Sequence, residues 1–312
     1  MHAESSPLAR LRALEVSPDR FRKLALASAL ALGAIVATGA LVRLTASGLG
    51  CESWPGCEKR SFFPASDIHG VVEFGNRVFG IVPISLTLLT WLAATRTPRL
   101  PRAAVRIGLA VALGTLAQAP LGLLTITSGL HPLLVMSHFL LALAVLGGAI
   151  VLAVEARRHE AGAGIRRVPA ELRRLGLVLA GSCLLLVVTG AFVTAAGPHP
   201  GDRADIRRLG TLDETLWVHV RVAALFGCAF LFVLGYLAAR RRNVPSLFRA
   251  GIVLLALVLL QTGVGELQYR TALPWGLVLL HVALATAVWA ATVALVTLLW
   301  RPTASFGWRE SN

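Results

Sequence analysis

The sequence has few charged residues. Only 15% of its 312 residues are Asp, Glu, Lys or Arg, whereas 56% are hydrophobic and the mean hydropathy is +0.72. A soluble domain of this length needs a polar shell, and this composition cannot supply one. The scarcity of charge therefore excludes a soluble globular protein and predicts a chain that lies largely within a bilayer.

Long apolar runs recur along the chain. Each holds about 20 residues, enough for a helix to cross roughly 30 Å of hydrocarbon. Eight are predicted, at about 24–44, 70–93, 106–126, 132–154, 175–196, 213–238, 250–267 and 275–299. We expect no cleavable signal peptide before the first, because residues 1–23 are polar and charged. The pattern predicts an all-α polytopic membrane protein.

Acidic residues are scarce as well. The chain has 16 Asp and Glu against 30 Lys and Arg, a formal charge of +14, which can indicate nucleic-acid binding. The placement of the charge argues otherwise, because 21 basic residues fall at the termini and in alternate connections, and the other connections carry seven. This is the positive-inside pattern. We therefore expect a multi-pass protein of the cell membrane, surrounded by lipid, with both termini in the cytoplasm and no nucleic-acid partner.

Cysteine is rare, with four in the chain. Cys183 and Cys228 lie within predicted helices, where a thiol usually packs as a small apolar group. Cys51 and Cys57 lie in CESWPGC, in the first connection on the predicted outer, oxidising side. Two thiols at this spacing can close a disulfide ring, which the sequence favours. The alternative is a reduced pair that handles redox equivalents.

The two halves of the chain resemble each other. Three residues recur at a constant offset of 143 positions: Gln118, Gly122 and His138 match Gln261, Gly265 and His281. The segments ATGALV (37–42) and VTGAFV (188–193) match at an offset of 151. A matched triple with shared spacing indicates a duplicated four-helix unit, in which we interpret the two glutamines as interhelical hydrogen-bonding amides.

We therefore expect eight transmembrane helices arranged as two pseudo-symmetric four-helix bundles. The predicted division is a cytoplasmic N-terminal segment (1–23), an N-terminal half (24–154), a cytoplasmic linker (155–174), a C-terminal half (175–299) and a cytoplasmic tail (300–312).

Two histidines of the second half lie at matched depth. His219 and His281 each lie about seven residues into a helix that runs inward, roughly 10 Å below the outer surface. Two imidazoles at equal depth on neighbouring helices can bind one metal centre from opposite sides, and in a helical bundle a haem is the natural occupant. The alternative is a structural histidine that is hydrogen-bonded to a neighbouring helix. Matched depth and the repeat favour the haem.

The first half keeps only part of this pattern. At the same offset of 143, His281 corresponds to His138, but His219 corresponds to Asn76. The first half therefore retains one candidate axial ligand and lacks the other.

An acid lies one turn from Asn76. His69, Glu73 and Arg77 follow at i, i+4 and i+8 and share one helix face. A carboxylate inside a membrane helix is costly and usually functional. The alternative is that Glu73 forms a structural ion pair with Arg77.

These segments together resemble the haem A synthase family, membrane enzymes that convert haem O to haem A. The matching pieces are TASGLGCESWPGC (45–57), VEFGNR (72–77), GPHPGD (197–202), WVHVR (217–221), LLHVA (279–283) and His138. They span nearly the whole chain and fit the duplicated eight-helix layout. The cysteine segment and the histidine pattern are the most specific of them.

The resemblance implies an oxidoreductase acting on a CH3 group. Successive hydroxylations would convert the C8 methyl of haem O to a formyl group, with molecular oxygen required, for use by haem–copper terminal oxidases. The C-terminal half would hold the iron of a haem b cofactor between His219 and His281. The N-terminal half would receive haem O, with Glu73 taking part in the chemistry and with the pair Cys51 and Cys57 near the substrate.

The resemblance also implies partners. Haem O synthase is the expected upstream enzyme, and an electron donor is required. The sequence shows no docking motif for that donor and indicates no oligomeric state.

One position departs from the family motif Glu-x-x-His-Arg, which here is Glu73-Phe-Gly-Asn76-Arg77. Either His138 alone holds haem O and leaves an axial position open, or His69 replaces the missing ligand. Because His69 lies seven residues before Asn76, about 10 Å higher on nearly the same face, we favour the open position.

Three arginines near these positions carry separate expectations. Arg77 and Arg221 follow the ligand position of their half by one or two residues, so either could pair with a haem propionate. The alternative is that both snorkel to the nearer interface, but we expect them to face the bundle interior, since neither lies at the end of a span. Arg43, at the outer end of the first helix, fits an interfacial anchor equally well.

Two other functions fit part of the sequence. A quinol-linked haem b electron-transfer protein needs two bis-histidine sites, and Asn76 argues against it. A transporter built from repeated halves, with Glu73 as a proton site, predicts helix breakers at matched positions. Pro83 and Pro120 have no proline counterparts in the second half. We therefore favour the haem-modifying enzyme.

Overall fold

The computed structural model describes residues 15–162, 168–202 and 206–301. These residues form eight long helices and no strand: α2 (Pro18–Leu44), α3 (Ile68–Arg96), α4 (Arg102–Thr127), α5 (Pro132–Glu160), α6 (Ala170–Ala196), α7 (Leu212–Ala239), α8 (Pro245–Arg270) and α9 (Trp275–Trp300). All eight are long and apolar enough to span a membrane. The all-α prediction is confirmed, and the chain is a multi-pass membrane protein.

The helices extend past the predicted apolar runs, mostly at one end of the molecule. α2 begins at Pro18 instead of about residue 24, and α5 continues to Glu160 instead of about 154. The added turns carry charged residues such as Arg22 and Arg157. Hydropathy measures only the apolar layer, whereas the backbone hydrogen bonds of a helix continue beyond it. The predicted spans were therefore correct in number and too short at these ends.

Side-chain caps set several helix starts. The Asp67 carboxylate accepts hydrogen bonds from the backbone N–H groups of His69 and Gly70, both at 3.1 Å, and thereby fixes where α3 begins. Thr211 accepts from the N–H of Glu214 at the start of α7. Because α3 and α7 carry equivalent positions of the repeat, these caps set the register of the candidate site residues.

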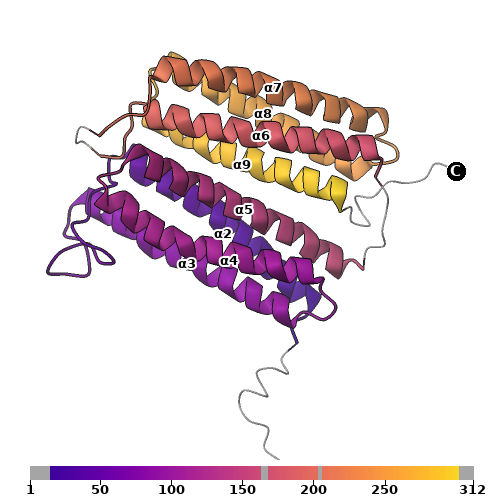
Figure 1. Ribbon diagram of the computed structural model, residues 1–312, viewed down its shortest axis with the longest axis horizontal. Helices are drawn as coiled ribbons and strands as arrows, with labels where there is room; N and C mark the ends of the chain where they lie inside the picture. The colour runs from indigo at the N-terminus through magenta and orange to yellow at the C-terminus, as the bar shows by residue number, and fades with distance from the viewer. Residues whose placement is uncertain (1–14, 163–167, 203–205, 302–312) are drawn as a thin grey trace, which may run out of the picture.

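The helices form two four-helix bundles that lie side by side (Figure 1). In the first, each of α2 to α5 packs on the next and α5 closes on α2; α6 to α9 repeat this ring, with α9 closing on α6. The bundles meet where α5 packs on α9, α2 on α9 and α5 on α6. Exchanging the halves preserves this set of contacts, as a pseudo-twofold relation requires. The predicted pair of pseudo-symmetric bundles is confirmed.

The loops lie at two ends of the molecule. The described parts of the connections 45–67, 128–131, 197–211 and 271–274 make up what we call the disulfide end, and those of 97–101, 161–169 and 240–244 make up the arginine-rich end. Residues 163–167 of the predicted linker, 1–14 of the N-terminal segment and 302–312 of the tail lie outside the described residues. Helices α5 and α6 occupy much of the rest of the predicted linker.

The bundles are joined by apolar packing with a few polar ties. The Trp289 indole N–H on α9 donates to the Leu143 carbonyl oxygen on α5 at 2.8 Å. Near the arginine-rich end, the buried Glu155 carboxylate pairs with Arg158 at 3.3 Å and with Arg301 of the other half at 3.2 Å. A buried carboxylate with two cationic partners is satisfied, so this group helps set how the halves meet.

The two free cysteines differ in environment. Cys183 is buried in the core of the second bundle, as expected, whereas Cys228 is exposed. The expectation that both pack inside was therefore wrong for Cys228. Both positions are apolar in sequence, and hydropathy cannot tell a lipid-facing from a bundle-facing side chain when the whole helix is apolar.

Candidate functional site

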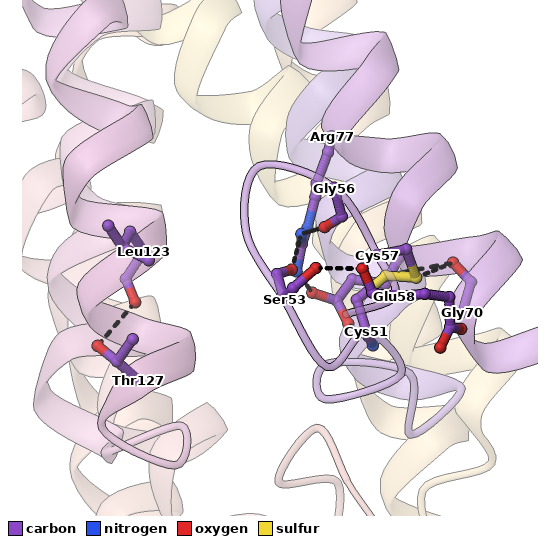
Figure 2. Close-up of polar contacts among 10 residues, drawn as sticks. Cys51, Ser53, Gly56, Cys57, Glu58, Gly70, Arg77, Leu123 and Thr127 are labelled. Carbon is purple, nitrogen blue, oxygen red and sulfur yellow. Dashed lines mark hydrogen bonds and ion pairs between the residues drawn. A yellow bond between two sulfur atoms is a disulfide. The ribbon is translucent and has the colours of Figure 1, made fainter. Parts of the chain in front are cut away.

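The connection between α2 and α3 folds over the start of α3 at the disulfide end (Figure 2). Cys51 and Cys57 form a disulfide with their Cα atoms 4.4 Å apart, so the predicted bridge is confirmed. Both sulfur atoms lie within 3.8 Å of the Gly70 carbonyl oxygen. A Cβ atom at Gly50 would lie 2.5 Å from the carbonyl carbon of His69, so only glycine allows this close approach of loop and helix.

Glu73 and Arg77 hold this loop in place. Glu73 is 4% exposed; its Oε2 accepts from the Cys51 N–H at 2.8 Å, and its Oε1 pairs with Arg77. Arg77 Nη1 donates to the carbonyl oxygens of Ser53 at 2.7 Å and Gly56 at 2.6 Å, and Figure 2 shows its side chain reaching these two groups. The ion pair considered as an alternative for Glu73 is present, and Arg77 faces the protein interior.

His69 lies in the first turn of α3. Its Nδ1 lies 3.0 Å from the hydroxyl oxygen of the buried Ser47, in the same connection that carries the disulfide. Asn76 follows two turns later on α3. His69 therefore belongs to the contacts between α3 and the loop.

His219 and His281 lie on diagonal helices of the second bundle. They come from α7 and α9, which do not pack directly on each other within the described residues, and each imidazole lies in electrostatic range of the other. The expectation of neighbouring helices was wrong, because α7 and α9 are diagonal in the ring. Neighbouring helices lie 8–10 Å apart, so diagonal ones are separated by roughly 11–14 Å.

Thr189 on α6 orients His219. The Thr189 hydroxyl donates to the carbonyl oxygen of Leu185 or Leu186, both at 3.0 Å, and its oxygen lies 3.1 Å from His219 Nδ1. Because the hydroxyl proton is engaged, the oxygen accepts from the Nδ1–H. The proton is then held on Nδ1, and the lone pair of His219 is on Nε2, the state of a metal-binding imidazole.

Gln261 on α8 contacts His281 in the opposite sense, because its amide nitrogen can only donate and the ring nitrogen that it meets therefore accepts. Its amide nitrogen lies 3.1 Å from His281 Nε2, and the other ring nitrogen, Nδ1, is buried with no partner among the described residues. A buried polar atom without a partner calls for an explanation, such as an ion or a bound group. The buried ring of His281 thus has unused bonding capacity inside the second bundle.

Two glycines make room for these imidazoles. A Cβ atom would lie 3.1 Å from His219 Cε1 at Gly190, and 2.9 Å from His281 Cε1 at Gly265. The sequence interpretation assigned no role to Thr189 or Gly190. The repeated segment VTGAFV contains both residues, and this repeat was the signal that could have identified them.

The first bundle repeats this layout with looser contacts. Asn76 on α3 and His138 on α5 again lie on diagonal helices. Thr38 donates to Asn76 Oδ1 at 2.7 Å, and His138 Nδ1 is buried without a partner among the described residues. Gln118 donates to the His138 carbonyl oxygen at 3.4 Å, so it bonds the backbone instead of the ring.

The residues of the second bundle fit the haem that the resemblance implies. The two imidazoles come from diagonal helices; the lone pair of His219 is placed on Nε2, and His281 would take up an iron at Nε2 once the Gln261 amide releases that nitrogen. Glycines replace the side chains that would crowd both rings. Paired histidines on facing helices of a bundle are a usual arrangement for holding haem iron.

Two arginines lie elsewhere than expected. Arg221 is exposed, with its guanidinium carbon 3.2 Å from the centre of the Trp217 ring, so it does not face the bundle interior. A cation stacks readily on an indole at a surface, and this contact holds the side chain there. Arg43 is no free interfacial anchor, because its Nη2 donates to the Thr194 carbonyl oxygen at 2.5 Å and joins the end of α6 to α2.

His199 bonds to Leu273, which lines a cavity at the disulfide end of the second bundle. Its Nε2–H donates to the Leu273 carbonyl oxygen at 2.8 Å and ties the α6–α7 connection to the α8–α9 connection. The cavity measures about 460 Å³ and is lined by residues that include Arg208, Tyr269 and Leu273. His199 therefore joins two connections at the disulfide end of the second bundle.

Comparisons with known proteins agree with this architecture. The chain matches the family of cytochrome oxidase assembly proteins over residues 22–293. It is similar to the haem A synthase of Shewanella oneidensis, at 26% identity over 84% of this chain and 92% of the relative. It is also similar to the haem A synthases of Bacillus pumilus, at 26% identity over 77% of this chain and 82% of the relative, and of Bacillus licheniformis, at 25% over 77% and 83%. The chain belongs to the cytochrome oxidase assembly protein family.

Proposed function

We propose that the protein is a haem A synthase, which oxidises the C8 methyl group of haem O to a formyl group within the membrane. The observation that carries the proposal is the pair His219 and His281, which come from diagonal helices of the second bundle and of which His219 has its Nε2 lone pair set by Thr189. The relatives named haem A synthase support it, since they are similar over most of this chain.

The second bundle is the proposed cofactor site. His219 and His281 hold the iron of a haem b, which when bound supplies a redox-active metal. Thr189 keeps His219 in the ligating tautomer, and Gln261 orients the ring of His281. Such partners of ligating histidines commonly decide how tightly the metal is held.

The first bundle is the proposed substrate site. His138 binds the iron of haem O, and Asn76 lies on the diagonal helix across from it. Arg77 Nε is buried and has no partner among the described residues, so it is placed to donate to a propionate. His69, held by Ser47, lines the site at the disulfide end.

Glu73 is the proposed acid–base residue. Its Oε2 is held by the Cys51 N–H and its Oε1 by Arg77, so the carboxylate has a fixed position beside the substrate bundle. In the proposal, Oε2 takes up a proton released during oxidation of the methyl group, and Arg77 balances the negative charge of the resting carboxylate. The disulfide loop limits the access of water to this group.

We place the disulfide end outside the cell and the arginine-rich end, with both termini, in the cytoplasm. A disulfide persists on the oxidising side of a cell membrane, and basic residues concentrate on the inner side. Haem O synthase is the proposed source of the substrate, with molecular oxygen and a separate electron donor as the other reactants.

Pigment extraction from cells tests this function. The chain is expressed in cells that make haem O but no haem A, and the extracted haems are separated by chromatography. We expect haem A with the native chain and none with Glu73→Gln. Glu266→Gln is the matched control, because Glu266 forms the same i, i+4 pair with Arg270 on an exposed face of α8 and should leave haem A formation unchanged. Absence of haem A from cells whose membranes contain the haem-loaded native chain would refute the function.

A further inference from the structure

The two bundles differ in the side chain that bonds to the equivalent threonine of each half. Thr38 on α2 and Thr189 on α6 are equivalent, since their segments match at an offset of 151. Thr189 accepts from the ring of His219, whereas Thr38 donates to the side-chain oxygen of Asn76 at 2.7 Å. The same support therefore positions an imidazole in one bundle and an amide in the other.

The space around Asn76 is more open than that around His219. A Cβ atom at Gly190 would lie 3.1 Å from the His219 ring, whereas one at the equivalent Gly39 would meet no atom within 4 Å. The smaller amide thus leaves unfilled the volume that an imidazole takes up in the second bundle.

The chemistry of Asn76 differs from that of histidine. An amide nitrogen has no free lone pair, so Asn76 cannot replace histidine as a nitrogen ligand to iron. With Oδ1 bonded to Thr38, the two N–H groups of the amide make no hydrogen bond to a described residue. They remain available as donors to a small molecule.

We infer that the first bundle holds its haem through one protein ligand, His138, and presents the Asn76 amide, anchored by Thr38, over the opposite face. This haem then binds small neutral ligands of the diatomic class, and the haem between His219 and His281 does not. The inference rests on the proposed function, because it takes the first bundle as a haem site. The inference gives a physical reason for the difference between the two halves. In the first bundle, an open position on the iron allows a small ligand to bind, whereas in the second both positions are taken by histidines and the iron serves redox chemistry.

Carbon monoxide is the probe, and the readout is spectroscopic. The purified full-length chain is loaded with haem in both bundles, reduced and titrated with carbon monoxide. We expect roughly one bound molecule for every two haems, because a bis-histidine site leaves no open position. Asn76→His should abolish this binding by supplying the second imidazole, with Thr38 ready to orient it.

Two further variants keep the test decisive if Asn76→His folds poorly. Asn76→Leu removes the amide without adding a ligand; it should retain carbon monoxide binding and release the gas roughly five-fold faster, as expected for the loss of one hydrogen bond. Val78→His adds an imidazole at an exposed position of the same helix and should change nothing.

Binding of carbon monoxide to both haems or to neither would overturn the inference. The same holds if Asn76→His binds the gas as the native chain does. These results do not affect the pigment test. A chain that forms haem A but binds carbon monoxide at neither haem would refute only the inference. A chain that binds one carbon monoxide per two haems and forms no haem A would sink only the proposed function.

Discussion

The two bundles share one arrangement of supporting residues but place different side chains within it. In the first bundle, Asn76 on α3 bonds to Thr38 on α2, and His138 on α5 lies beside a glycine of α4. In the second, His219 on α7 bonds to Thr189 on α6, and His281 on α9 lies beside a glycine of α8. In the second bundle these contacts are tight, and both ligand positions are imidazoles. In the first, an amide stands at one position and the glycine contacts are looser. Duplication preserved the support, and changes at a few side chains separated the roles.

The disulfide end sharpens the difference. Glu73 and Arg77 hold the disulfide loop over the first bundle, but their equivalents at the offset of 143 are Leu216 and Val220. Within the described residues, these two positions of the second bundle therefore carry apolar side chains in place of the acid and its cationic partner. A group that only transfers electrons needs no proton acceptor beside it, whereas a site that oxidises a methyl group does. The difference matches the proposed division between cofactor and substrate.

The largest expected effect comes from removing the candidate iron ligand of each bundle in turn. His281→Ala should lower haem A formation by at least about 100-fold, because removing a ligand costs no less than removing its supporting partner. It should also remove the bis-histidine spectrum of the reduced protein. His138→Ala should abolish haem A formation and keep that spectrum. If both variants lost the same spectral species, the bundles would not hold separate haems.

A second test concerns the buried charge that only the first bundle has. Glu73→Ala leaves Arg77 buried without its partner, which should lower the free energy of unfolding by about 3–5 kcal/mol. Glu73→Gln keeps an acceptor for the Cys51 N–H and should lower stability less while still abolishing haem A formation. Thermal unfolding in detergent, followed with pigment analysis, separates the two effects. Equal stability of both variants would contradict a role for Glu73 in holding the loop.

The threonines provide a matched pair. Thr189→Val keeps the shape of the side chain but removes the oxygen that fixes the His219 tautomer, and should weaken haem binding in the second bundle by about 10–100-fold. Thr38→Val removes the bond to Asn76 and should leave the bis-histidine spectrum unchanged. Haem transfer to a scavenging apoprotein measures both. An equal loss from the two variants would show that the hydroxyl groups act only in packing.

The smallest expected effect is steric. Gly265→Ala places a methyl group 2.9 Å from the His281 ring, and Gly122→Ala places one 3.6 Å from the His138 ring. The first distance forces the imidazole to shift, whereas the second is an ordinary contact. We expect Gly265→Ala to weaken haem binding several-fold, on the order of 1 kcal/mol, and Gly122→Ala to have little effect. A stronger effect of Gly122→Ala would mean that the first bundle is the tighter one.

Much of the fold was predictable, because in a bilayer the length and polarity of each segment are set by the apolar layer itself. The repeat identified His138 and His281 as equivalent, and the short spacing of Cys51 and Cys57 favoured their bridge. The diagonal relation of His219 and His281 was not predictable, since spacing along a chain says nothing about which helices are neighbours. The surface position of Arg221 was missed for a different reason: the i, i+4 spacing of Trp217 and Arg221 predicts their contact on one helix face, and the interpretation did not use it.

The sequence by itself determined eight spans, their division into two related halves and the residues that distinguish those halves. These features follow from local composition and from the internal repeat. Only the tertiary structure decided that the paired histidines lie on diagonal helices, that Thr189 and Thr38 support different partners, and that the Glu73 carboxylate accepts from the Cys51 N–H. The members of each of these pairs are 22 to 62 positions apart in the chain, and such pairings arise from how the helices pack, which no single segment encodes.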